Sequence, residues 1–158
     1  MAESVVRPTM KFIVAVDGSE EGEAALAYAT DVADAVDGSI TVVYAVDPDI
    51  YEEGGSEPVE GIADAQDRLI IQSVEDAEER GLDILDAAAS FALELGHSVE
   101  TELLYGDPVR EITDYAEDGG FDGIFIGHRG LSERVERVLG SVAKGVVERA
   151  TVPVTVVR

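Results

Sequence analysis

Three glycines and a serine in the last third of the chain have the residue types expected of an anion-binding loop. Gly127 and Gly130 follow a short apolar run, and Gly140-Ser141 stands at the start of a helix expected over residues 141–149. Glycine lets backbone amides approach a phosphate closely, and the N-terminus of a helix favours negative charge. Ser141 can supply a hydroxyl and an amide. The pattern predicts an anion site; the alternative is that the glycines only permit turns and a helix cap.

The charge distribution favours the anion site. The chain carries 34 acidic and 11 basic residues and a net charge of -23, yet residues 129–149 hold five bases against three acids. A positive segment in so negative a chain coincides with the glycines and the helix start. Anion binding therefore explains this stretch better than turn formation alone.

Composition excludes several classes of protein. The chain has no cysteine, so disulfide scaffolds, cysteine zinc sites and thiol catalysis are ruled out. The negative charge repels nucleic acid and anionic membranes, and we expect neither as a partner. No apolar run reaches the length of a membrane span, and residues 1–10 lack the apolar core of a signal peptide. We expect a cytoplasmic protein, and the acid excess with scarce lysine resembles proteins of salt-accumulating halophiles, the alternative being an acidic mesophilic protein.

Five apolar runs predict buried strands, at residues 11–16, 40–46, 99–105, 123–126 and 152–157. Helical patterns lie between most of them, the longest from Ile70 to Leu95 with Gly81 as a point where it could kink or break. Ser19 and Asp107-Pro108 are typical of helix starts, and Gly38 is typical of a helix end. An acidic loop is expected over about 47–67. Continuous apolar strands alternating with helices are typical of a parallel sheet covered on both faces. We predict one doubly wound α/β domain over residues 1–158.

Open parallel sheets bind ligands beyond the carboxyl ends of their strands. Asp17, Ala45 and Gly127 all stand at such ends. We predict the strand order 3-2-1-4-5 rather than 2-1-3-4-5, because only the first makes strands one and four neighbours and brings Asp17 and Gly127 to one crevice. Asp17 is at least as often a turn cap as a catalytic residue in this position.

The spacing Gly127-x2-Gly130-x9-Gly140-Ser141 resembles the nucleotide-binding signature of the universal stress protein family. The resemblance covers nearly the whole chain. It also includes residues 14–19, 106–108 and 152–156, and Asp122. In that family the complete signature goes with ATP binding, so the resemblance implies ATP as the ligand, bound with Mg²⁺.

The resemblance also implies the residues of the site. The phosphates and ribose would be held by Gly127, Gly130, Gly140, Ser141 and the amide of Val142. Ala15, Ala45 and Ile126 would line the adenine slot, Asp17 would lie near the ribose or a bound metal, and Arg129 belongs to the same nucleotide-binding set.

Two positions depart from the family pattern. Ile126 replaces a frequent methionine and keeps an apolar wall, whereas His128 replaces a hydroxyl residue and removes that side-chain contact. We expect His128 to be a passive loop residue rather than a proton shuttle. The other histidine, His97, follows a helix-terminating glycine and is expected to face solvent.

The resemblance implies an ATP-binding stress protein that acts as a nucleotide-dependent switch, with weak hydrolysis or autophosphorylation as its most demanding chemistry. The sequence positions no general base. The alternative is a nucleotide-hydrolysing or nucleotidyl-transfer enzyme on a related sheet, but those need a longer loop after strand one than Asp17-Gly18-Ser19 provides. The chain also lacks the hydroxyl-rich phosphate loop that a flavodoxin-like electron carrier has after its first strand. It lacks the late strand-end lysine of a phosphorelay receiver domain as well.

The predicted final strand, residues 152–157, would lie at the edge of the sheet. A long apolar edge is an aggregation hazard that proteins pair, cover or charge. We therefore expect a homodimer in which two such edges pair about a twofold axis, an expectation that the family resemblance supports.

Overall fold

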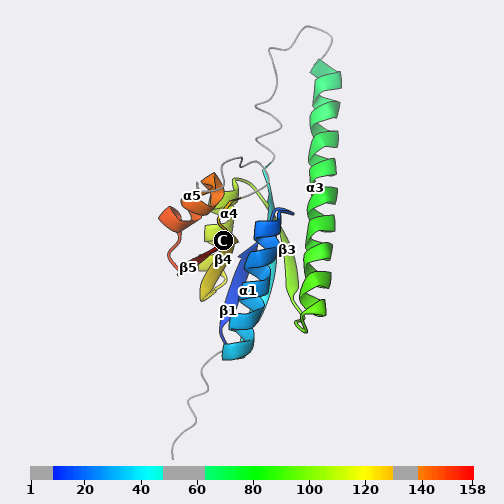
Figure 1. Ribbon diagram of the computed structural model, residues 1–158. Coiled ribbons are helices and arrows are strands. Elements are labelled where there is room, and N and C mark those ends of the chain that lie inside the picture. The colour runs from blue at the N-terminus through cyan, green and yellow to red at the C-terminus, as the bar shows by residue number, and fades with distance from the viewer. Residues whose placement is uncertain (1–8, 48–62, 130–138) are drawn as a thin grey trace, which may run out of the picture.

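A computed structural model describes residues 9–47, 63–129 and 139–158, with only the backbone described from 63 to 72. Strands and helices alternate along these residues (Figure 1). Their bounds are β1 Lys11–Ala15, α1 Glu20–Val36, β2 Ser39–Val46, α3 Ala63–Glu94, β3 Glu100–Tyr105, α4 Pro108–Asp118, β4 Gly123–Gly127, α5 Ser141–Arg149 and β5 Val154–Val157.

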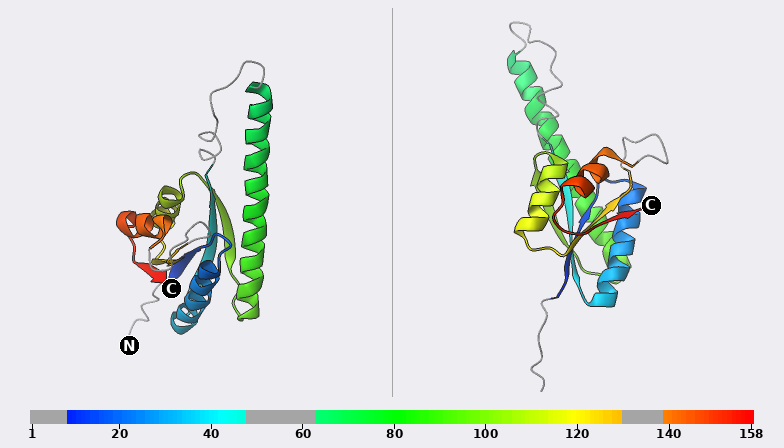
Figure 2. Two further views of the ribbon diagram at one scale, coloured as in Figure 1. Left: turned by 45° about the horizontal axis from the view of Figure 1, so that its top comes forward. Right: turned by 90° about the vertical axis from the view of Figure 1, so that its left-hand side faces the viewer.

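The five strands form one parallel sheet in the order β3-β2-β1-β4-β5, which confirms the predicted fold and strand order. Helices α1 and α3 cover one face, and α4 and α5 cover the other (Figure 2). Each strand differs from its predicted range by one or two residues, at one end only. The predicted acidic loop is too long at its C-terminal end, because residues 63–67 belong to α3. Residues 48–62 lie outside the described part.

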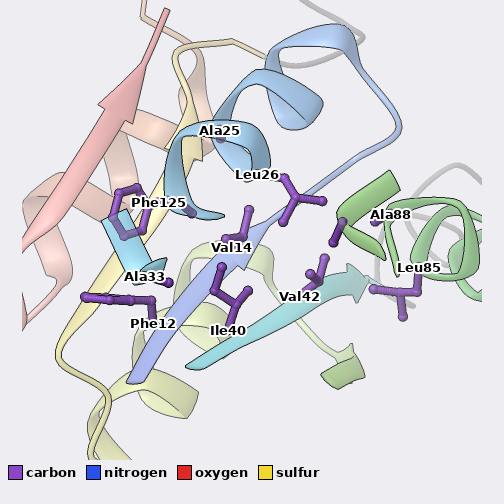
Figure 3. Packing of buried hydrophobic residues seen from close by; sticks show 12 residues of the cluster. Phe12, Val14, Ala25, Leu26, Ala33, Ile40, Val42, Leu85, Ala88 and Phe125 are labelled. Carbon is purple, nitrogen blue, oxygen red and sulfur yellow. The ribbon is translucent and has the colours of Figure 1, made fainter. Parts of the chain in front are cut away.

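The strands read as continuous apolar runs because both sheet faces are buried. On β1, Phe12 and Val14 pack under α1 and α3 (Figure 3), whereas Ile13 and Ala15 pack under α4 and α5. Phe125 of β4 meets the ring of Phe12 edge to face, with ring centroids 5.4 Å apart. The core is therefore divided in two by the sheet.

Helix α3 runs through Gly81 as one continuous helix of 32 residues. A Cβ at position 81 would lie 2.7 Å from the Tyr44 ring and 2.9 Å from Leu103. Gly81, where a kink or break was possible, instead allows the helix to lie close against β2 and β3. No helix within the described residues is both long enough and apolar enough to cross a membrane.

The helix starts follow the sequence more closely than the helix ends. Ser19 accepts a hydrogen bond from the Gly22 amide, and Asp107 caps α4 with Pro108 in its first turn, both as predicted. At the end of α1, however, the left-handed residue is Asp37 (φ 55°) rather than Gly38. Gly38 is needed for space, because a Cβ there would lie 2.9 Å from the Met10 carbonyl oxygen.

The expectation that His97 faces solvent is wrong. Its side chain is only 12% exposed, and its Nε2 lies 2.8 Å from Oδ1 of Asp34 on α1. The left-handed Gly96 turns the chain at the end of α3 so that the next residue points back against α1. The pair joins the C-terminal ends of α3 and α1.

Candidate functional site

A cavity opens at the carboxyl ends of β1, β2 and β4, between these strands and the first turns of α4 and α5. Strand, turn and helix residues from five separate parts of the chain line it. They are Ala15, Val16, Asp17, Ser19, Gly22, Tyr44, Ala45, Pro108, Ile112, Ile126, Gly127, Arg129, Gly140, Ser141, Val142 and Ala143.

Nine of the ten residues predicted for the site line this cavity, and the tenth, Gly130, lies outside the described residues. The strand order accounts for the meeting. Ala15 on β1 is the register partner of Ile126 on β4, and Asp17 and Gly127 follow them at the same sheet edge. Chain segments more than one hundred residues apart in sequence thus form one wall.

Ala15, Ala45 and Ile126 give the cavity an apolar side. Ala15 and Ile126 are buried, and the short alanine side chains on neighbouring strands β1 and β2 leave space at the sheet edge. A flat apolar group such as a nucleobase suits a slot of this composition.

The N-terminus of α5 forms the polar side of the cavity. Gly140 is its N-cap and makes no side-chain capping bond, and its first turn contains no acidic residue. In contrast, α1 begins with Glu20, Glu21 and Glu23, and α4 has Glu111 in its first turn. Of the three helix N-termini at the cavity, that of α5 is therefore the one best suited to an anion.

One hydrogen bond joins the two ends of the glycine-rich segment. The Gly140 amide donates to the His128 carbonyl, with the nitrogen and oxygen 2.6 Å apart, and the His128 amide donates to the carbonyl of Val157. These bonds place residues 127–129 beside residues 140–142. His128 is absent from the residues that line the cavity.

Asp17 has a turn-cap role. Its Oδ1 accepts a hydrogen bond from the Ser19 amide, and Gly18 between them has a positive φ of 88°. This bond shapes the turn that leads from β1 into α1. Asp17 also lines the cavity.

An ion pair lies at the cavity beside Gly127. The Nε of Arg129 donates to Oε1 of Glu21 at 3.0 Å, and each side chain is 21% exposed. A backbone hydrogen bond lowers the pKa of the Glu21 carboxyl most, and the hydrogen bond and charge of Arg129 and the charge of His128 lower it further, against the opposing effect of burial. Glu21 is therefore ionised at neutral pH.

Sequence reasoning missed the contributions from the N-terminal ends of α4 and α1. Pro108 and Ile112 line the cavity, as do Ser19 and Gly22. The predicted strand order carried a signal for α4, because a helix that starts after β3 begins at the same sheet edge. Ser19 had been assigned only a capping role.

Comparisons with known proteins agree with this architecture. The model of the universal stress protein family matches residues 8–158. The chain is 30% identical over 148 residues to universal stress protein YxiE of Bacillus subtilis, covering 94% of this chain and 98% of the relative.

Solved structures show the same fold. Universal stress protein UspA from Lactobacillus plantarum superposes with a TM-score of 0.68 at 24% identity, covering 96% of this chain and 99% of the other. A universal stress protein from Archaeoglobus fulgidus, solved in complex with dAMP, has a TM-score of 0.65 at 26% identity and covers 94% of this chain and 98% of its own.

Proposed function

The chain belongs to the universal stress protein family, and we propose that its cavity binds ATP with Mg²⁺. In this proposal the protein is a cytoplasmic member of the ATP-binding subgroup. It acts as a nucleotide-dependent switch in the stress response and hydrolyses ATP weakly at most.

The observation that carries the proposal is the meeting of nine predicted residues at one cavity. Its apolar side, Ala15, Ala45 and Ile126, fits a base, and the α5 N-terminus with Ser141 and Val142 fits phosphate oxygens. The relative solved with dAMP supports an adenine nucleotide as the ligand class.

Asp17 is the protein group proposed to face a magnesium ion. Within residues 9–47, 63–129 and 139–158, no three His, Asp or Glu side chains gather closely enough to form a metal site of their own. A single carboxylate fits Mg²⁺ that arrives with the nucleotide, because Mg²⁺ usually takes one or two carboxylates together with phosphate oxygens. The ion would neutralise phosphate charge in this acidic protein.

Replacing Ser141 by Asp tests the phosphate end of the site. The new carboxylate suits a helix N-terminus, so folding stability should be kept, whereas its charge repels phosphate. ATP affinity, measured by calorimetry in high salt, should fall at least about tenfold, since that loss needs only about 1.4 kcal/mol of repulsion.

Ser141→Ala is the matched control and should bind far more tightly than the Asp variant. Mass spectrometry of what co-purifies in high salt gives an independent check. Unchanged affinity in Ser141→Asp would place the phosphates elsewhere, and a co-purifying flavin would overturn the ligand class.

We also propose a homodimer through β5. Pro153 and Val157 turn their carbonyls to β4, where they accept hydrogen bonds from Ile124 and His128. Along a parallel strand, successive residues direct their amides and carbonyls alternately to one side and to the other. Val154 and Val156 therefore direct theirs away from β4. β5 is the last strand of the sheet, and this edge is where a second copy would pair.

Val156→Pro tests the dimer. Proline removes an edge amide, and proline is tolerated on a strand where its nitrogen faces away from the sheet. Light scattering in high salt should show a dimer for the wild type and a monomer for this variant. Val156→Ala also removes the partly buried valine side chain but keeps the amide, and it should stay dimeric. A dimeric proline variant, or a monomeric wild type, would refute the β5 interface.

The composition supports one further proposal, that the chain is adapted to high salt. Its net charge of -23 is carried with only two lysines, Lys11 and Lys144. At molar salt the screening length shrinks to about 3 Å, so the mutual repulsion of surface acids is largely removed.

A further inference from the structure

The ion pair between Glu21 and Arg129 joins two parts of the chain that lie 108 residues apart. Arg129 lines the cavity, whereas Glu21 stands behind it in the first turn of α1. Glu21 accepts a hydrogen bond from the Nε–H of Arg129, and the two Nη atoms of a guanidinium carry four further N–H donors. Those donors form the planar fork that suits phosphate oxygens.

The backbone on both sides of the pair is closely packed. A Cβ at Gly127 would lie 2.8 Å from the backbone of Glu21, so β4 touches the first turn of α1 directly. A Cβ at Gly140 would lie 3.0 Å from the Cα of Arg129. These contacts restrain the backbone around Arg129. The long arginine side chain is the part whose conformation they do not restrain.

An unpaired arginine side chain has many rotamers, and ordering it on binding costs free energy. A carboxylate hydrogen-bonded to Nε removes much of that freedom before the ligand arrives. Both side chains are about four-fifths buried, so the pair is screened less than one at the surface.

We propose that Glu21 is a positioning residue for nucleotide binding, which holds Arg129 by its Nε so that the Nη groups meet the phosphates of the ligand. The proposal rests on the proposed function and adds to it a residue outside the cavity lining. In this proposal the Glu21–Arg129 ion pair does more than join α1 to the residues after β4, because Arg129 also borders the ligand.

Glu21 also carries a negative charge close to the phosphates, and this gives a rival expectation. If repulsion dominates, removing the charge should strengthen ATP binding. If positioning dominates, removing the acceptor should weaken it. A purely structural role predicts a third result, in which ligands with and without phosphate are weakened alike.

The experiment measures affinities for ATP and for adenosine by calorimetry in high salt, using Glu21→Ala, Glu21→Gln and the control Glu23→Ala. Glu23 is an exposed acid of the same first turn, so its loss removes one charge without touching Arg129. Positioning predicts that Glu21→Ala loses about tenfold in ATP affinity, the usual scale for a hydrogen bond to a charged group. Adenosine affinity should stay unchanged.

Glu21→Gln keeps an oxygen acceptor for Nε and should restore most of the ATP affinity. In an Arg129→Lys background, Glu21→Ala should have no further effect on ATP. ATP affinity that is unchanged or raised in Glu21→Ala, or adenosine affinity that falls equally, would overturn the proposal while wild-type binding leaves the proposed function intact. If the wild type binds no adenine nucleotide, both fail.

Discussion

Lowering potassium chloride from about 1 M to about 0.01 M should lower the melting temperature of this protein steeply, because the Debye length grows from about 3 Å to about 30 Å. The chain has a net charge of -23, so most pairs of surface charges repel one another. Longer screening lengths bring more of these pairs into interaction.

The structure adds a local cause for the expected salt dependence. Helices α1, α3 and α4 have no basic residue in their last turns, where the helix dipole favours cations. Acids stand at or near these ends instead, namely Asp37, Glu94, Glu117 and Asp118. Each such misplaced charge costs about 0.3–1 kcal/mol at low ionic strength, and salt screens the cost.

These costs set the scale of the effect. One kcal/mol moves the melting temperature of a domain of this size by about 2–4 °C, so together they predict a fall of about 10 °C between the two salt concentrations. Circular dichroism at a series of chloride concentrations measures it. Sucrose, an uncharged solute that is also excluded from protein surfaces, is the control for effects other than screening.

Two single variants separate the effect of charges at helix ends from the repulsion among surface acids in general. Asp37→Asn removes an exposed charge at the left-handed C-cap of α1, a conformation that asparagine also accepts, and should raise the melting temperature in low salt. Glu20→Gln removes a favourable charge from the first turn of the same helix and should lower it. Both effects should vanish in high salt. A melting temperature that is flat across the salt series would refute the adaptation to high salt.

The fold was predictable because the short-range patterns in the sequence mark the same strands and helix starts that the structure contains. Apolar runs buried on both faces marked the strands, and Ser19 and Asp107-Pro108 marked helix starts through bonds that span only a few residues. The strand order followed from requiring Asp17 and Gly127 to share one crevice, and the sheet has that order.

Features that depend on distant partners were not predictable in the same way. His97 turns inward because Asp34, far away in sequence, lies in reach once α1 and α3 pack. At Gly81 the sequence left a kink or break open, because nothing local reveals that Tyr44 and Leu103 occupy the space of a side chain there. Glu21 was missed for the same reason, since its partner lies on another strand end.

Gly127 shows how a correct site residue can have an additional purpose. Its position in the family signature implied close approach of backbone to phosphate. In the structure it lines the cavity, and it also gives the backbone of Glu21 room to touch β4. A side chain at this position would therefore meet α1 even in the absence of ligand.

Gly127→Ala should accordingly destabilise the protein, whereas Gly123→Ala should not. Both glycines are buried on β4, and neither has a positive φ, so the replacement restricts the unfolded chain equally in both. A Cβ at Gly123 would have its nearest contact, the Phe12 ring, at an ordinary 3.4 Å, but a Cβ at Gly127 would lie 2.8 Å from backbone atoms of Glu21. The difference between the variants isolates the contact between β4 and α1.

Overpacking of this kind typically costs about 1–3 kcal/mol, and here the strain falls on backbone that carries both Glu21 and Arg129. Denaturant unfolding in high salt should show this loss for Gly127→Ala only, and calorimetry should show ATP affinity reduced about tenfold or more, since the cavity wall must shift. Gly123→Ala should match the wild type in both measurements. If the two variants are equally stable and bind ATP equally well, the contact between β4 and α1 does not shape the nucleotide site.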